Sequence, residues 1–422
     1  MRRSRSRERP SQAFAGRSDS EESSDSMSSV RGNGEHITLA LTEMAHQGSA
    51  IGRHNDEVVF VAYGIPGETV EAEVLWRHKT YLEATVVRVI EASPHRVEAP
   101  CPYYGDCGGC QWQHIDYRHQ LRLKQEVVID QLQRIGKFES PPVLLTIGME
   151  DPWHYRNHAR FTVTKEGQLG FVRRGTHRVI PIQECLLMHP WINQTMGELR
   201  GKCAETRQLS IRYGVNTEDW LIQPRLKAEG IAVETGQKTY QEEMMGSRFT
   251  IASPSFFQVN TRMAERLIEV ARGYLALQGT EILVDAYAGV GTFAVLLAPS
   301  VRRIIAVEES ASAVRDAASN AQGVANVEFI EGKVEDVLPD LAEKPDAVLL
   351  DPPRTGCHSR VIAALVAHKP RTVVYVSCDP ATLARDLRLL CDGGFQLEEV
   401  QPVDMFPQTY HIECVARLSS KD

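Results

Sequence analysis

The sequence predicts a multidomain α/β protein with an N-terminal β-barrel, a central α/β domain and a C-terminal doubly wound domain. Its 422 residues exceed what one hydrophobic core usually organises, so two or three domains are expected. Short β-rich runs separated by turn residues fill the N-terminal part of the chain. In the C-terminal part, apolar strands alternate with helices, which is typical of a parallel sheet with helices on both faces. We therefore place the three domains at residues 35–97, 98–250 and 251–422.

Residues 1–34 consist mainly of Arg, Ser, Glu, Asp and Gly, so we expect a disordered tail that cannot bury enough apolar surface to order itself. The tail has no apolar segment of the kind that a secretory signal carries. No apolar run in the chain reaches the roughly 18–20 residues that span a bilayer. The sequence therefore predicts a cytoplasmic protein with no membrane partner.

The formal net charge of −8 counts against nucleic-acid binding, because nucleic-acid-binding proteins are usually basic. Salt screens charges that lie more than about 10 Å apart, so local charge matters more than the total. Basic side chains gather in short stretches at 77–79, 118–124, 154–160 and 173–178. Each stretch taken alone is equally compatible with ordinary solvated surface.

The N-terminal domain is expected to be a small barrel of the oligonucleotide-binding (OB) kind. β-Forming runs lie at 37–39, 58–61, 69–74 and 82–87. Turn-forming residues separate them, at Gly48, Gly52, 55–56, Gly64 and 66–67. About five short strands in so short a segment suit an OB-like barrel, although the pattern alone also allows a purely structural barrel.

The central domain combines helical and strand patterns with a cluster of cysteines. Helices are predicted at 120–135 and 190–199, and strands at 159–164 and 170–173. The nine cysteines of the chain are unevenly spaced and odd in number, which argues against a disulfide framework. Four of them suggest a metal site: Cys101, Cys107, Cys110 and Cys185. Four thiolates can hold either zinc or an iron–sulfur cluster, and the spacing alone favours zinc.

The C-terminal domain begins with a helix predicted at 262–277. Strands are predicted at 282–287, 303–308, 327–330, 347–351, 372–377 and 395–403. This alternation predicts a Rossmann-like, doubly wound parallel sheet, with ligands bound at the carboxyl ends of its strands.

A glycine turn follows the first of these strands and predicts a nucleotide-like cofactor. Gly289 and Gly291 allow a ligand to approach the backbone closely. The third glycine of a dinucleotide fingerprint is absent, because residue 294 is Ala, so NAD is disfavoured. The next strand ends at Glu308, whose carboxylate can accept hydrogen bonds from both hydroxyls of a ribose.

The motif Asp351-Pro352-Pro353-Arg354 follows a third apolar strand and resembles the active-site loop of methyltransferases. Enzymes that methylate exocyclic amino groups carry an aromatic residue after the prolines, which stacks on the target base. Arg354 stands there in this chain, which argues for methylation of carbon instead.

Cys378 and Glu413 are the candidate nucleophile and base for such a reaction. Cys378 follows a buried strand in Ser377-Cys378-Asp379-Pro380. Carbon 5 of uracil is a poor nucleophile, but adding a thiolate to carbon 6 makes carbon 5 reactive, and cysteine ionises most readily near neutral pH. A base must then remove the carbon-5 proton, and partial burial could raise the pKa of Glu413 for this task. We interpret His358 and His411 as structural.

At this point the motifs together resemble the RNA uridine-5-methyltransferase family, over about residues 36–418 and in consistent order. They are Phe256-Phe257-Gln258-Val259-Asn260, Tyr287-Ala288-Gly289-Val290-Gly291-Thr292-Phe293, Asp351-Pro352-Pro353-Arg354, Ser377-Cys378-Asp379-Pro380, and Asp404-Met405-Phe406-Pro407-Gln408-Thr409-Tyr410-His411-Ile412-Glu413. The resemblance implies that Cys378 is the nucleophile and Glu413 the base. It also implies that S-adenosylmethionine is contacted by Gln258, Tyr287, Glu308 and Asp351.

The cysteine segment and the barrel resemble one branch of this family, which acts on 23S ribosomal RNA. In that branch the cysteines at 101, 107, 110 and 185 hold a [4Fe-4S] cluster, so the resemblance implies a cluster with a structural, RNA-positioning role. The barrel resembles the branch's TRAM domain, which by the same resemblance the transfer RNA branch lacks. We therefore expect a monomer that needs no protein partner and binds a looped or flipped uridine of 23S RNA.

Other functions differ from this one in specific residues. A 5-methylcytosine RNA methyltransferase shares the carbon-6 chemistry but typically has an extra cysteine in the Asp-Pro-Pro motif, where this chain has proline. Transfer RNA is an alternative substrate for the same reaction. A non-catalytic RNA-binding factor would not need both Cys378 and Glu413 beside a complete cofactor turn. An iron–sulfur redox protein would need a second redox motif, which we do not find in the sequence.

Overall fold

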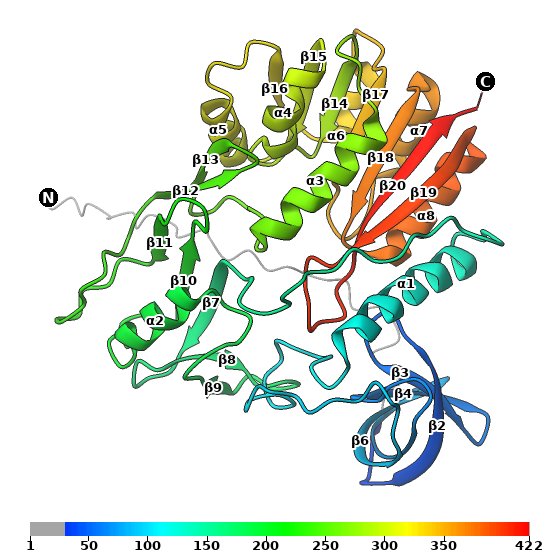
Figure 1. Ribbon diagram of the computed structural model, residues 1–422, viewed down its shortest axis with the longest axis vertical. Coiled ribbons are helices and arrows are strands. Elements are labelled where there is room, and N and C mark those ends of the chain that lie inside the picture. The colour runs from blue at the N-terminus through cyan, green and yellow to red at the C-terminus, as the bar shows by residue number, and fades with distance from the viewer. Residues whose placement is uncertain (1–29, 422) are drawn as a thin grey trace, which may run out of the picture.

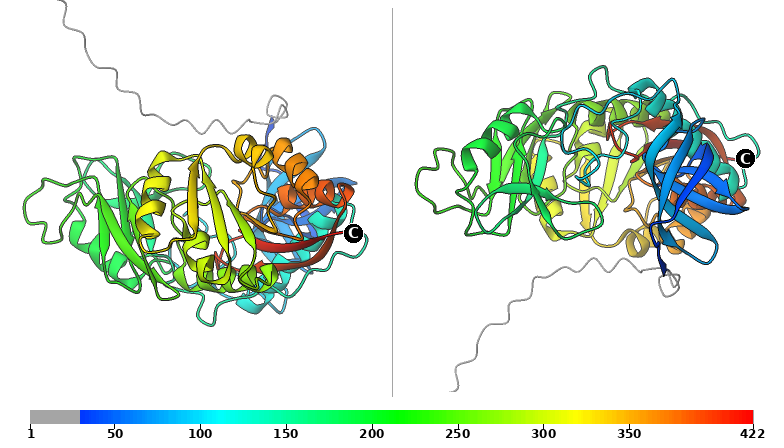
Figure 2. Two further views of the ribbon diagram at one scale, coloured as in Figure 1. Left: turned by 90° about the horizontal axis from the view of Figure 1, so that it is seen from above. Right: turned by 90° about the horizontal axis from the view of Figure 1, so that it is seen from below.

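The computed structural model describes residues 30–421, which form a barrel, a central sheet and a C-terminal sheet (Figure 1). Figure 2 shows the barrel and the central sheet at opposite ends, with the C-terminal sheet between them. The predicted disordered tail at 1–34 lies largely outside the described residues. Within the described part of the chain, no helix is long and apolar enough to cross a bilayer.

The N-terminal domain is a closed five-stranded barrel, which confirms the predicted OB-like architecture. Its strands are β2 (His36–Met44), β3 (Ala50–His54), β4 (Glu57–Ala62), β5 (Thr69–Arg77) and β6 (Tyr81–Glu91). They pair in the order β5-β2-β3-β4-β6, and pairing of β5 with β6 closes the barrel. Along β2, buried and exposed residues alternate, so one face of the strand fills the interior with Ile37, Leu39 and Leu41.

Two details of the barrel differ from the prediction. A short strand β1 (Val30–Arg31) pairs with Trp76 and Arg77 of β5, so ordered structure begins before residue 35. Gly52 lies inside strand β3 and not in a turn. A Cβ atom at this position would lie 2.6 Å from the Ala40 carbonyl oxygen, so the glycine is needed for close strand packing.

The central sheet is antiparallel throughout, in the order β11-β10-β7-β8-β9. Its strands are β7 (His158–Val163), β8 (Leu169–Val172), β9 (Val179–Pro181), β10 (Gln208–Tyr213) and β11 (Trp220–Gln223). Helix α2 (Pro190–Leu199) packs its apolar side on this sheet through Ile192, Met196 and Leu199. The predicted helix at 190–199 and the two predicted strands are therefore present.

Other parts of residues 98–250 pack elsewhere. Helix α1 (Tyr117–Arg134) lies against the C-terminal domain next to α8, and not on the central sheet. The following segment pairs with the edge of the C-terminal sheet through Val143 and Ile147. The hairpin of β12 (Thr239–Met244) and β13 (Ser247–Ala252) shares its core with the C-terminal domain. A buried ion pair of Lys124 in α1 with Asp404 lies at the contact between this helix and the C-terminal domain.

The C-terminal domain is a seven-stranded sheet in the order β16-β15-β14-β17-β18-β20-β19. The strands are β14 (Ile282–Ala286), β15 (Arg303–Glu308), β16 (Val327–Glu331), β17 (Ala347–Leu350), β18 (Thr372–Ser377), β19 (Phe395–Val403) and β20 (Glu413–Ser420). Strands β14 to β18 are parallel, as predicted, but β20 runs antiparallel to both of its neighbours. A short loop can join β19 only to an antiparallel neighbour, so the prediction of a purely parallel sheet is wrong at this end.

Helices cover both faces of the sheet, which gives the three layers of a doubly wound fold. One face carries α3 (Thr261–Leu275) and α4 (Thr292–Leu297), and the other carries α7 (Ser359–His368) and α8 (Pro380–Asp392). The remaining helices, α5 (Ala311–Asn320) and α6 (Val334–Val337), follow β15 and β16. Alternate residues of β14 and β17 enter the two separate apolar cores. This arrangement leaves the carboxyl ends of the parallel strands open to a ligand.

Candidate active site

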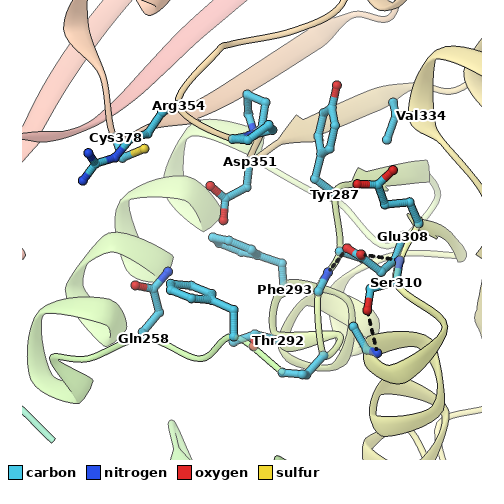
Figure 3. Close-up of a pocket in the computed structure, with 18 of the residues that line it drawn as sticks. Gln258, Tyr287, Thr292, Phe293, Glu308, Ser310, Val334, Asp351, Arg354 and Cys378 are labelled. Carbon is cyan, nitrogen blue, oxygen red and sulfur yellow. Dashed lines mark hydrogen bonds between the residues drawn. The ribbon is translucent and has the colours of Figure 1, made fainter. Parts of the chain in front are cut away.

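A cavity of about 1030 Å³ lies at the carboxyl ends of the parallel strands, where the sequence predicts the ligand site. Figure 3 shows Glu308 and Ser310 at one end of it, Cys378 and Arg354 at the other, and Asp351 between them. The structure brings together all six residues that we predicted to contact cofactor or perform chemistry. They are Gln258, Tyr287, Glu308, Asp351, Cys378 and Glu413.

Glu308 and the glycine turn are tied together by hydrogen bonds. The two carboxylate oxygens of Glu308 accept the backbone N–H groups of Gly289, at 2.9 Å, and Ser310, at 2.8 Å. Each oxygen keeps a second lone pair, which can accept a hydroxyl of a bound sugar. Gly291 has φ of 80°, and a Cβ atom there would also crowd the ring of Phe329, so glycine is required.

Two aspartates make the cavity floor acidic: Asp351 lines the cavity, and the fully buried Asp285 lies behind the lining in β14. Asp285 lies near the end of β14 beneath the glycine turn. Among the described residues neither of its carboxyl oxygens makes a hydrogen bond of ordinary geometry, although the backbone N–H of Ala294 favours its charged form. Burial, together with the charge of Asp351, raises the pKa of Asp285 to about 7. Burial also raises the pKa of Asp351 to about 7. A ligand that brings a positive charge would relieve this cost, so the site favours a cationic ligand.

Asp285, which is fully buried in β14 behind the cavity lining, is a residue that sequence reasoning missed. A signal for it was available, because an acidic residue inside an otherwise apolar strand, four residues before Gly289, cannot be explained by packing.

The segment that carries Gln258 is held by the central domain. Asn157, just before β7, donates from its side chain to the Gln258 carbonyl oxygen at 3.1 Å, and its backbone N–H donates to Val259. Arg212 of β10 donates to the carbonyl of Ser255 at 2.8 Å. These bonds fix a loop in which Phe256 stays 71% exposed at the cavity edge, where an aromatic face can stack on a base.

Cys378 lies directly before Asp379, which caps the N-terminus of α8 by accepting the N–H groups of Ala381 and Thr382. The positive end of the α8 dipole favours a thiolate at this position. Burial and the charge of Glu413 act in the opposite sense and raise the pKa of Cys378 to about 12. Burial and the charge of Glu413 therefore outweigh the helix dipole, and the raised pKa favours the neutral thiol.

Glu413 is the first residue of β20, and its side chain is buried. The next residue, Cys414, pairs with Ser377 of β18, the residue before Cys378. Burial, together with the charge of Asp351, raises the pKa of Glu413 well above its ordinary value. The guanidinium of Arg354 opposes this rise in Glu413 and also favours the thiolate of Cys378. The arginine after the two prolines therefore faces both candidate groups, a role that the sequence pattern did not reveal.

The two histidines that we interpreted as structural both line the cavity. His358 caps α7 by accepting the N–H of Arg360. His411 lines the cavity, and burial and the charge of Arg354 lower its pKa to about 4, so it is neutral near pH 7.

The barrel reaches this site through the turn between β2 and β3. His46 lies 3.1 Å from the carboxylate of Asp379, the residue after Cys378. The carbonyl oxygen of Gly48 accepts the indole N–H of Trp112 at 3.0 Å. A Cβ atom at Gly48 would lie 2.6 Å from Cβ of Tyr410, so the turn packs tightly on the loop before Glu413.

The four clustered cysteines also approach one another. All four are half-buried, and Cys185 and Cys110 each have a pKa raised by burial and by the neighbouring thiols of Cys107 and Cys101. The N–H of Gly109 donates to the sulfur of Cys107 at 3.4 Å. Among residues 30–421, no group of three or more His, Cys, Asp or Glu side chains is arranged to hold a metal ion.

A solved structure shares this fold. The crystal structure of the Pyrococcus abyssi tRNA (uracil-54, C5)-methyltransferase with S-adenosyl-L-homocysteine matches with a TM-score of 0.71 at 24% identity. The match covers 90% of this chain and 100% of that one, more than residues 98–422 alone could supply.

Curated relatives and family models agree with this architecture. RNA methyltransferases of Halalkalibacterium halodurans and of Synechocystis sp. are each 36% identical over 92% of this chain, and the matches cover 97% and 96% of those proteins. Residues 31–87 match the TRAM domain, and residues 236–421 match the tRNA (uracil-5-)-methyltransferase family. The chain therefore belongs to the family of RNA methyltransferases that combine a TRAM domain with a catalytic domain of the uracil-5-methyltransferase type.

Proposed function

We propose that this protein transfers a methyl group from S-adenosylmethionine to carbon 5 of a uridine in RNA through a covalent Cys378 adduct. The observation that carries the proposal is the placement of Cys378, Glu413 and Arg354 at one end of a cavity whose other end holds Glu308 and the glycine turn. The sugar of the cofactor would lie at Glu308. Its sulfonium would then lie near the carboxylates of Asp285 and Asp351.

The reaction balances with these residues. The Cys378 thiol loses its proton to solvent, its sulfur adds to carbon 6 of the uracil, and the ring becomes an enolate whose carbon 5 attacks the methyl group. The bond from sulfonium to methyl breaks and leaves S-adenosylhomocysteine. Glu413 then takes the carbon-5 proton, the double bond re-forms, and the thiolate of Cys378 leaves carbon 6. A carboxylate whose pKa is raised by burial is a stronger proton acceptor than an ordinary glutamate.

Ribosomal 23S RNA is the substrate that we propose, on the strength of the cysteine segment and its resemblance. Transfer RNA is the second candidate, because the name of the matching solved structure specifies a tRNA uridine. Protein incubated with methyl-labelled cofactor and with purified 23S RNA or total tRNA in separate reactions tests this choice. Label in 23S RNA alone supports the proposal, and label in tRNA alone replaces it with the second candidate.

Cofactor affinity should depend on pH, because the two aspartates at the cavity floor change their charge near pH 7. Asp285 and Asp351, with pKa values of about 7, ionise between pH 6 and pH 8 and then attract the sulfonium. The affinity for S-adenosylmethionine should therefore rise over this range, by roughly 3- to 30-fold, since one pKa unit corresponds to about 1.4 kcal/mol. S-adenosylhomocysteine has the same amino acid and nucleoside groups but no sulfonium charge, so its affinity should rise much less. Calorimetry at three pH values measures both, and equal slopes would refute this electrostatic account.

We further propose that Cys101, Cys107, Cys110 and Cys185 hold a [4Fe-4S] cluster. All four thiols are half-buried, and burial and neighbouring thiols raise the pKa of Cys107, Cys110 and Cys185, so a group that binds thiolates and brings positive charge would relieve this cost. A cubane is wider than a single ion, so its ligands need not converge as a zinc site requires. The cluster would join two distant parts of the chain and hold the turn at 101–110 in place.

Anaerobically purified protein should contain about four irons and four acid-labile sulfides per chain and absorb visible light. Cys185→Ser should lose most of the iron. Cys203→Ser should retain it, because Cys203 is buried outside the four-cysteine group and its thiol donates to the carbonyl of Leu199. One zinc per chain without visible absorption would contradict the proposal.

A further inference from the structure

The loop that joins β19 to Glu413 is held by hydrogen bonds from buried side chains outside the C-terminal sheet. Residues 404–411 make up all but the last residue of this loop, which extends toward α1 (Figure 1). Tyr155 donates its hydroxyl to the carbonyl of Pro407 at 3.1 Å. Asn260 donates its side-chain amide to the carbonyl of Met405 at 3.1 Å. The backbone of the catalytic loop is thus held mainly by groups that are distant in sequence.

Lys124 of α1 makes three hydrogen bonds to this loop. Its ammonium donates to the Asp404 carboxylate at 2.6 Å, to the Phe406 carbonyl at 3.2 Å and to the His411 carbonyl at 2.8 Å. An ammonium has three N–H donors, so every one is used. Its three acceptors lie at both ends of the loop, and one side chain therefore closes the loop on itself.

Burying the charged side chain of Lys124 costs desolvation free energy. Its side chain is fully buried, as is that of Asp404. A buried ion pair is often no more stable than apolar residues of the same volume, so overall stability is a weak explanation for it. Such a pair does fix geometry, because it tolerates only arrangements that satisfy all of its hydrogen bonds.

Two neighbours of Lys124 on α1 reinforce the same loop. Gln120 donates to the side-chain oxygen of Gln408 at 2.9 Å and accepts the Gln408 backbone N–H at 3.1 Å. This pairing holds Gln408 at φ of 68°, a left-handed conformation that disfavours a side chain. Tyr117 donates to the second oxygen of Asp404 at 2.9 Å. Positions 117, 120 and 124 are three and four residues apart and so share one face of the helix.

We propose that Lys124 is a positioning residue that sets the loop at 404–411, and through it Glu413, for removal of the carbon-5 proton. The inference rests on the proposed role of Glu413 as the base. Only one residue separates the carbonyl that Lys124 holds at His411 from Glu413. The nucleophile is not on this loop, because Cys378 follows β18 and is fixed by the cap of α8. Loss of Lys124 should therefore affect elimination more than formation of the adduct.

The test compares Lys124→Met with the double variant Lys124→Met/Asp404→Asn. The single variant leaves a buried carboxylate unpaired and is expected to be less stable, whereas the double variant removes both charges. In single-turnover reactions with labelled cofactor and RNA, either variant should methylate RNA but release free product roughly 10- to 100-fold more slowly, since a 1 Å misplacement can cost about 10²-fold. Methylated RNA should accumulate as a covalent complex on denaturing gels. Arg134→Met, at an exposed position of the same helix, should behave like the wild type.

Four outcomes distinguish failure of this inference from failure of the proposed function on which it rests. Wild-type release by the double variant overturns the inference. So does parallel loss of adduct and product with cofactor affinity and thermal midpoint unchanged, because it would place Lys124 at the first step. If Glu413→Gln, run beside them, turns over normally, then the proposed base is wrong and the inference falls with it. If Glu413→Gln accumulates the adduct while the double variant does not, the inference alone is refuted.

Discussion

Cys378→Ala is expected to abolish both the covalent RNA adduct and the methylated product. Without the sulfur, nothing adds to carbon 6, and carbon 5 stays too poor a nucleophile to attack the cofactor. Removal of a catalytic nucleophile can lower turnover by about 10⁶-fold, and we expect at least about 10⁴-fold here. The measurement is transfer of labelled methyl to RNA, together with a denaturing gel for the adduct.

Cys391→Ala is the matched control for this variant. Cys391 is also half-buried and lies on α8, but at the far end of the helix and away from the cavity. It should retain wild-type activity, and Cys378→Ala should retain cofactor affinity because Glu308 and the glycine turn are intact. Substantial methylation by Cys378→Ala would mean that another group, or none, attacks carbon 6.

Glu413→Gln should fail at a later step and so look different on the same gel. The nucleophile and the cofactor site are intact, so addition and methyl transfer proceed. Carbon 5 then keeps its proton, and the thiolate cannot leave. Loss of a general base lowers a rate by about 10²- to 10⁴-fold, and we expect that loss in product release. The variant should therefore accumulate a methylated RNA–protein complex that survives denaturation.

Electrostatics also predicts how this variant should affect Cys378. The charge of Glu413 is the largest effect after burial that raises the pKa of the thiol. A neutral glutamine should lower that pKa, so adduct formation by Glu413→Gln should be no slower than in the wild type. A variant that forms no adduct would contradict the separation of roles between the two residues.

Much of this site could be predicted from the sequence because its residues lie where strands end. Glu308, Asp351 and Cys378 each follow an apolar run, and the carboxyl ends of neighbouring parallel strands meet at one edge of the sheet. The glycine turn marked the same edge. Their convergence in one cavity followed from the fold class.

What the sequence could not provide depends on contacts between distant segments. Strand β20 was missed because its first residues looked like the end of a loop, and only its pairing with β18 makes them a buried strand. Gly52 was predicted to lie in a turn, because the close approach of Ala40 in the neighbouring strand cannot be recognised from the sequence. The hydrogen bonds of Lys124 to residues 404–411 join positions that are 280 residues apart or more. The local sequence of neither segment predicts this contact.

The raised pKa of Cys378 was missed for the same reason. Proximity to a helix N-terminus is visible in the sequence, but burial and the facing carboxylate of Glu413 are not. These effects favour the neutral thiol over the thiolate.

Nucleoside analysis by mass spectrometry tests the central claim most directly. RNA lacking the modification is incubated with the purified protein and with S-adenosylmethionine carrying a deuterated methyl group, and then digested to nucleosides. The account predicts 5-methyluridine that retains all three deuterium atoms, because the methyl group is transferred intact and the proton lost comes from carbon 5. Labelled 5-methylcytidine, a methylated amino group, or no labelled nucleoside in either 23S RNA or tRNA would contradict it.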